Sequence, residues 1–161
     1  MKKIIYIAQR KTNILSNFAN SSQVISTCKE LAKLHSSFEL LLLNHMNQPK
    51  ANIEEKIREK DQGINFKIKF IKNSVFFKKD LIYGLYISIN FVFSKSIFYT
   101  RQDWVALFLS LLNKPVFFEA HDFNEKRICL QLMKKFISNK NNFKIITISK
   151  SLKEKFKEEN F

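Results

Sequence analysis

Residues Ser96–Ala120, SIFYTRQDWVALFLSLLNKPVFFEA, contain two short apolar runs separated by a longer amphipathic one. Ser96–Thr100 and Pro115–Glu119 have the length and composition of buried strands, and a leading proline suits the first residue of a strand. Asp103–Asn113 lies between them with helical spacing, and the carboxylate of Asp103 suits the positive end of a helix dipole. The segment therefore predicts two parallel strands joined by a crossover helix.

The same alternation continues on both sides of this segment and predicts an α/β fold. Because most strands are apolar along nearly their whole length, we expect a doubly wound, mainly parallel, Rossmann-like sheet with helices on both faces. The chain of 161 residues fits one such domain, residues 1–161. The other predicted strands are Lys3–Ala8, Phe38–Leu43, Asn65–Ile71 and Phe143–Ile148, and the other predicted helices are Ser22–His35, Asn52–Gln62, Lys79–Phe93, Glu125–Asn139 and one that starts at Ser149 or Ser151.

Some elements carry more detailed expectations. Asn65–Ile71 alternates with period two, which indicates a half-exposed strand near a sheet edge. Ser21 or Ser22 is expected to cap the first helix, and Ser151–Glu154 fits a capping box for the last. Leu81–Phe93 is apolar nearly all round, so we expect a buried core helix. A helix in a membrane interface is the alternative, and a spanning helix is less favoured because spanning takes about 20 apolar residues.

Ligands of doubly wound folds bind at the carboxyl ends of the strands. The loops expected there are Gln9–Asn20, Asn44–Gln48, Lys72–Ser74, Arg101–Asp103, Glu119–Phe123 and Ser149. None of them contains glycine, because the only glycines of the chain are Gly63 and Gly84. A dinucleotide-binding or phosphate-cradling loop needs glycines for close backbone approach, so the sequence argues against NAD(P)-dependent enzymes and P-loop nucleotide hydrolases.

The composition gives weaker indications of partners and compartment. Lys and Arg number 28 against 14 for Asp and Glu, an excess that favours an anionic partner such as nucleic acid, an anionic membrane surface or a phosphorylated substrate. Only four of the 28 are arginine, and an AT-rich coding sequence also explains a chain rich in Lys, Asn, Ile and Phe. No recognisable nucleic-acid-binding motif is present, and the three well-separated histidines give no zinc cluster.

The two cysteines and the N-terminus bear on the compartment. Cys28 and Cys129 lie in apolar helical patterns, so we expect buried thiols of a reducing compartment. Gln9–Lys11 interrupts the first apolar run too early for a signal peptide. A cytoplasmic location is therefore expected, with peripheral attachment to the inner face of the membrane as an extension.

The segment PVFFEAHDF, Pro115–Phe123, contains the candidate catalytic residues. Side chains alternate along a strand, so Glu119 and His121 are expected to point the same way at its carboxyl end. A histidine oriented by a carboxylate of Glu119 or Asp122 can act as a general base or proton shuttle. The alternatives are a surface loop histidine beside a turn aspartate and, less favoured, a Glu/His/Asp metal site.

Three motifs in order resemble the N-terminal, acceptor-side domain of family 4-type glycosyltransferases of the GT-B fold. A strand ends at Arg101, Lys114-Pro115-Val116 leads into Glu119-Ala-His-Asp122, and Ile146-Thr-Ile-Ser149 precedes a helix. The resemblance is firm over about Ser96–Phe156 and weaker over Met1–Phe93. The first loop departs from the pattern because it lacks the glycines that many members have there.

The resemblance implies roles for the candidate residues. His121 matches a histidine that lines the cleft near the reacting sugar, and Glu119 matches its neighbour. Arg101, Asp122 and Ser149 are implied in substrate binding, although Arg101 could simply pair with Asp103 or Glu119 and Ser149 could be only a helix cap. No cofactor or metal is implied.

The resemblance also implies an incomplete enzyme. The P-N-G turn and the donor domain with its paired glutamates do not follow within the 161 residues. A nucleotide sugar would therefore be a co-substrate only with a donor-domain partner chain, and the acceptor would be a glycan or a lipid-linked molecule. The alternative function is a non-catalytic basic module that docks on an anionic membrane surface or a partner protein.

Overall fold

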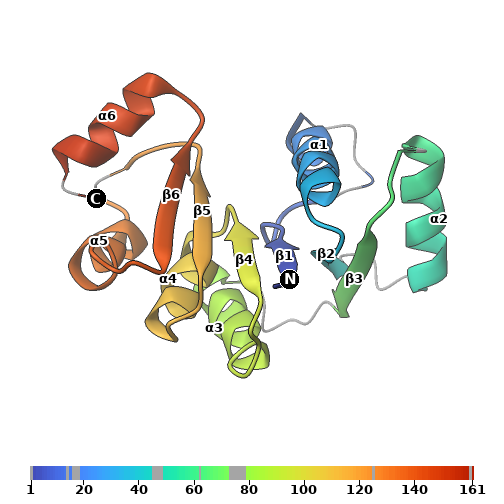
Figure 1. Cartoon of the computed structure of the whole chain (residues 1–161), viewed down its shortest axis with the longest axis horizontal. Coiled ribbons are helices and arrows are strands. Elements are labelled where there is room, and N and C mark those ends of the chain that lie inside the picture. The colour runs from blue at the N-terminus through green and yellow to red at the C-terminus, as the bar shows by residue number, and fades with distance from the viewer. Residues whose placement is uncertain are drawn as a thin grey trace.

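The computed structural model of the chain describes residues 2–13, 15, 19–44, 49–61, 63–72, 79–124, 126–159 and 161. Strands and helices alternate along these residues, as the sequence predicts (Figure 1). The strands are β1 (Ile4–Ile7), β2 (Phe38–Asn44), β3 (Lys67–Lys72), β4 (Ile97–Thr100), β5 (Val116–Ala120) and β6 (Phe143–Thr147). The helices are α1 (Ala19–Leu34), α2 (Lys50–Lys60), α3 (Asp80–Asn90), α4 (Asp103–Leu111), α5 (Ile128–Phe136) and α6 (Lys150–Glu158).

The strands form one six-stranded sheet in the order β3-β2-β1-β4-β5-β6. Every pair of neighbouring strands is parallel, which confirms the predicted doubly wound, Rossmann-like α/β domain. After the edge strand β3 the chain returns to the middle of the sheet and places β4 beside β1. This change of direction between β1 and β4 is the position at which such sheets bind ligands.

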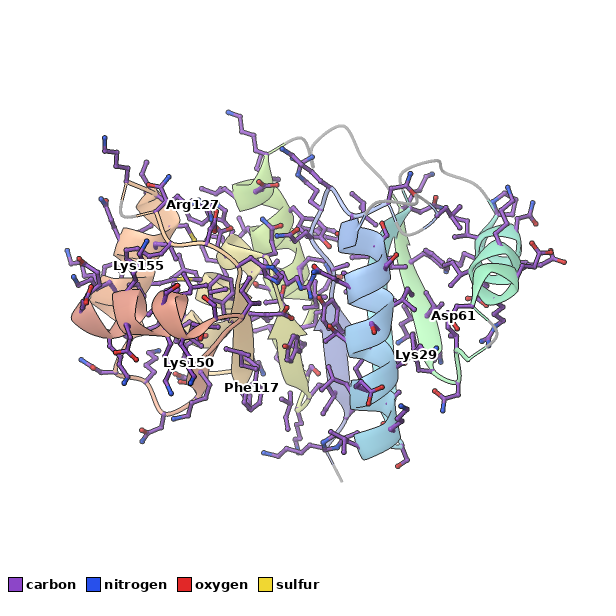
Figure 2. All side chains as sticks on the ribbon, turned by 90° about the horizontal axis from the view of Figure 1, so that it is seen from above. Lys29, Asp61, Phe117, Arg127, Lys150 and Lys155 are labelled. Atoms are coloured by element: carbon purple, nitrogen blue, oxygen red, sulfur yellow. The ribbon has the colours of Figure 1, made fainter. Side chains whose placement is uncertain are left out.

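Helices cover both faces of the sheet, and each face has its own apolar core. On one face, Val24 of α1 and Ile57 of α2 pack against Tyr6 and Leu40 of the central strands. The opposite face is covered by α3, α4 and α5, whose core residues include Tyr83, Val105, Leu109 and Met133. Lys29 of α1 and Asp61 after α2 form an ion pair at 3.0 Å that links the two helices (Figure 2).

Two parts of the sheet differ in their side chains: one holds a buried, ion-paired carboxylate, and the other leaves apolar side chains partly exposed. At the start of β2, the buried Glu39 carboxylate faces the side of α3 and pairs with Lys3 at 2.6 Å and with Lys69 of β3 at 3.2 Å. On the α1 side of β5 and β6, Phe117 and Ile146 each remain 37% exposed. Figure 2 shows Phe117 on the same side of the sheet as α1, beyond the area that α1 covers.

Helix α3 is only partly the buried helix that its sequence predicts. Tyr83 and Ile87 are fully buried, and Gly84 lies against Trp104 of α4, where an added Cβ atom would stand 2.7 Å from the Trp104 Cβ. The opposite side of α3 is apolar but exposed, because no other described element lies over it. No helix among the described ranges is long and apolar enough to cross a membrane.

The predicted cap of the first helix and the predicted capping box of the last helix are wrong, whereas the predicted start of the last helix at Ser149 is confirmed. Helix α1 already begins at Ala19, so Ser21 and Ser22 lie inside it, and the Ser21 hydroxyl donates to the Asn13 carbonyl at 2.7 Å. In α6 the cap is Ser149, whose hydroxyl accepts a hydrogen bond from the Leu152 amide at 3.2 Å. Ser151 is therefore already inside the helix and cannot start a capping box.

Candidate functional site

The loops that follow β1, β4 and β5 meet at one edge of the sheet because all the strands run in the same direction. These loops contain Gln9, Arg101 and His121, respectively. A hydrogen bond of 3.2 Å from the Gln9 amide to the Arg101 carbonyl joins the first two loops. Of the loops that the sequence places at this edge, residues 45–48 and 73–74 and several positions between 14 and 18 lie outside the described residues.

The centre of the candidate site is an ion-paired cluster of Arg101, Glu119 and His121. One Glu119 carboxylate oxygen, Oε1, lies 2.6 Å from Nη2 of Arg101 and 2.7 Å from Nε2 of His121. The side chains of Arg101 and Glu119 are 4% and 8% exposed, whereas that of His121 is 33% exposed. The structure therefore confirms that Glu119 and His121 point the same way, and it identifies Glu119 as the partner of Arg101.

The charge on Glu119 determines which nitrogen of His121 carries the proton. Burial by itself would raise the pKa of the Glu119 carboxyl, but the hydrogen bond and charge of Arg101, with smaller contributions from His121 and Tyr99, lower it below its usual value. An ionised carboxylate can only accept hydrogen bonds, so Nε2 of His121 must be the donor. In its neutral form His121 consequently has Nδ1 available as a proton acceptor.

Residues from other elements hold this cluster in position. Nη1 of Arg101 donates to Oε1 of Gln23 in α1 at 3.4 Å. The Tyr99 side chain lies near Glu119, and burial together with that carboxylate raises the pKa of its hydroxyl. After His121, Phe123 packs edge-on against Phe156 of α6 with ring centroids 4.9 Å apart, which fixes the course of the loop.

A cavity of about 500 Å³ lies beside the cluster at the β1–β4 switch point. It is lined by Gln9 and Lys11 after β1, by Arg101–Trp104 after β4, by Lys126–Cys129 at the start of α5, and by Asp80 at the start of α3. Arg101 belongs to both the cavity wall and the ion-paired cluster, so it joins the two.

The lining of the cavity is polar and carries more positive than negative charge. The lining contains four cations, Lys11, Arg101, Lys126 and Arg127, and two carboxylates. One of these carboxylates, Asp80, is paired with Arg10 at 2.6 Å. The other is Asp103, whose pKa is raised, chiefly by burial. A cavity with this balance suits a hydroxyl-rich or anionic ligand better than an apolar one.

Asp122 and Ser149 do not join the cluster. Asp122 is exposed and pairs with Arg127 at 2.8 Å, at the start of α5. It therefore does not orient His121, a role that the sequence left open between Asp122 and Glu119. The Ser149 hydroxyl caps α6, so its observed role is structural.

Other site residues had weaker signals in the sequence or none. Gln102 and Trp104 flank the predicted helix start at Asp103, but nothing in the spacing showed that their side chains line a cavity. Gln23 contacts Arg101 across 78 positions of sequence, and only the packing of α1 on the sheet reveals that contact.

The described ranges contain no group of three or more His, Cys, Asp or Glu residues that could hold a metal ion. Cys28 and Cys129 are free, buried thiols. The chain matches no protein-family model, and neither a curated protein nor a solved structure is significantly similar to it.

Proposed function

We propose that this chain forms the acceptor-side domain of a two-domain sugar transferase, in which His121 contacts the reacting groups. The observation that carries the proposal is the Arg101–Glu119–His121 cluster at the carboxyl edge of a doubly wound sheet, next to a polar cavity. The motifs around Arg101, Glu119 and Ser149 support the same function through their resemblance to glycosyltransferases of the GT-B fold.

The chemistry follows from the tautomer of His121. When a sugar passes from a nucleotide sugar to an acceptor hydroxyl, the bond from the anomeric carbon to the diphosphate breaks and a bond to the acceptor oxygen forms. The acceptor oxygen loses its proton, and Nδ1 of His121 can take it while Glu119 stabilises the resulting imidazolium. Arg101 keeps Glu119 ionised throughout, so it acts as a positioning residue.

The nucleotide sugar needs a second binding surface. Gly63 and Gly84 are the only glycines of the chain, and the first follows α2 while the second lies inside α3. Neither offers a phosphate-binding turn after a strand. We therefore propose that a donor domain, in a partner chain or elsewhere in the same protein, closes over the carboxyl edge of this sheet. The acceptor is a glycan or a lipid-linked molecule, and the free buried thiols support a location in the cytoplasm.

Gene replacement in the source organism tests the proposal. Deletion should remove a glycoconjugate, and the wild-type gene should restore it. His121→Ala and Glu119→Gln should fail to restore it while the purified variants remain folded. Lys153→Ala, an exposed change on α6, is the matched control and should restore it fully.

The second candidate function is a non-catalytic binding module, which the net charge of +14 favours. Under that function His121→Ala would complement the deletion as well as the wild type does. Full complementation by His121→Ala would therefore refute the transferase proposal.

A further inference from the structure

The outward side of α3 is a continuous apolar surface. Leu81, Leu85 and Ile89 follow one another at intervals of four residues, so they form a single stripe along the helix. Ile89 is 61% exposed, and Phe93, in the turn that follows the helix, is 93% exposed. The full surface, which we call the α3 face, consists of Leu81, Ile82, Leu85, Tyr86, Ile89 and Phe93.

The α3 face makes no contribution to the core. The opposite side of the same helix supplies Tyr83 and Ile87 to the buried cluster, and Gly84 makes the close contact with α4. Single exposed apolar residues are common in soluble proteins, but six contiguous large ones mark a surface that binds something. Figure 1 shows α3 and α4 together along the lower part of the molecule.

The charges around the α3 face favour an anionic membrane as its partner. Lys79 at one end of the helix and Lys95 beyond the other are both exposed. Between Leu81 and Phe118 the only acidic residue is Asp103, which lines the cavity. The nearest carboxylate is Asp80 in the first turn of α3, and its charge is paired with Arg10 at 2.6 Å. An apolar helix face flanked by lysines matches helices that lie at the boundary between headgroups and acyl chains.

We propose that the α3 face seats this domain on an anionic lipid bilayer, with Leu85, Ile89 and Phe93 in the acyl boundary and Lys79 and Lys95 among the headgroups. A protein partner is less favoured because the face offers few polar groups for specific recognition. The proposal is independent of sugar transfer, since it uses no residue of the Arg101–Glu119–His121 cluster.

Sedimentation with phosphatidylcholine vesicles, with and without phosphatidylglycerol, tests this proposal in low and high salt. The wild type should bind the anionic vesicles and keep part of that binding in high salt. Leu85→Gln/Ile89→Gln should weaken the binding by about tenfold or more, because two side chains no longer transfer into the acyl boundary. Leu34→Gln removes a side chain of α1 that is 72% exposed, and it is the matched control that should bind like the wild type.

Three results would overturn the proposal. The first is equal binding of the double variant and the wild type, and the second is complete loss of wild-type binding in high salt, which would indicate charge attraction alone. The third is a dimer, seen by light scattering, that binds no vesicles and dissociates in the double variant, which would make the α3 face a contact between two copies. Fluorescence quenching measures whether the α3 face inserts into the bilayer. Brominated lipids should quench tryptophan fluorescence in Tyr86→Trp more than in Leu34→Trp.

Discussion

Replacement of Arg101 by methionine would leave the Glu119 carboxylate buried without its guanidinium partner. The two side chains are 4% and 8% exposed and meet at 2.6 Å, so water cannot replace the lost interaction. Breaking a buried ion pair by removing one partner costs about 3–5 kcal/mol. His121 contacts the same carboxylate oxygen at 2.7 Å and offsets part of this cost when it is protonated. We therefore expect the loss of stability to lie near the lower end of this range.

Urea denaturation measures this cost. A loss of ~3 kcal/mol would move the urea midpoint down by about 1–2 M, given the usual dependence of unfolding free energy on urea. Arg101→Met/Glu119→Gln removes both charges, so it should be less destabilised than the sum of the two single variants by about 1–3 kcal/mol. A single-variant cost below about 1 kcal/mol, or strict additivity, would refute the view that the pair is buried and coupled.

The pH dependence gives a second check, and its sign follows from the pKa of Glu119. In the wild type this pKa is lowered, so the pair stabilises the fold above the unfolded-state pKa of about 4.3 and loses that effect as the pH falls. In Arg101→Met the main remaining influence on the Glu119 carboxyl is burial, which raises its pKa. Protonation at low pH then removes the buried negative charge and reduces the loss of stability in the variant. The stability difference between the two proteins should therefore be largest near neutral pH and shrink towards pH ~4. A difference that is constant with pH would contradict this account.

Three further predictions concern the helices and thiols. Gly84→Ala should lower the free energy of unfolding by ~1–2 kcal/mol in thermal melts, because the added Cβ meets Trp104 at 2.7 Å and overpacking exceeds the gain in helix propensity. Ser149→Ala should cost about 1 kcal/mol of stability through the lost α6 cap, whereas Ser151→Ala should change stability by less than ~0.5 kcal/mol; equal effects would contradict the cap assignment. Cys28 and Cys129 should stay unreactive towards a thiol-specific reagent until denaturant unfolds the chain, since burial raises the pKa of both thiols; rapid labelling of the native protein would be the contrary result.

The order and type of the helices and strands could be predicted because the spacing of apolar residues in the sequence matches the residues that the structure buries. Leu40–Leu43 is buried on both faces of β2, and the alternation of Lys67–Ile71 places β3 at an edge. The starts of α1 and α6 were less predictable, because the sequence offers several serines near each of them and only the path of the chain selects the cap. Ser149 rather than Ser151 caps α6 for this reason.

The candidate site was partly predictable for a similar reason. Strand alternation was enough to place Glu119 beside His121, because only one residue lies between them in the sequence. The partner of Arg101 could not be chosen between Asp103 and Glu119, because that choice depends on which strands lie side by side. The cavity depends on four segments that are distant in sequence, so no local pattern could reveal it.

The lysines of β3 have a consequence for how this sheet can meet another protein. An edge strand offers unpaired backbone groups that can add a strand from another molecule, and natural proteins block such edges with lysine side chains. Lys67 and Lys69 lean over β2 to the shared Glu39 carboxylate at 3.9 and 3.2 Å. A second molecule that extended the sheet past β3 would have to place its own strand beside these two lysines, which carry like charges on an edge strand. Addition of a strand from another molecule, and fibril-like stacking, are therefore disfavoured at this edge of the sheet.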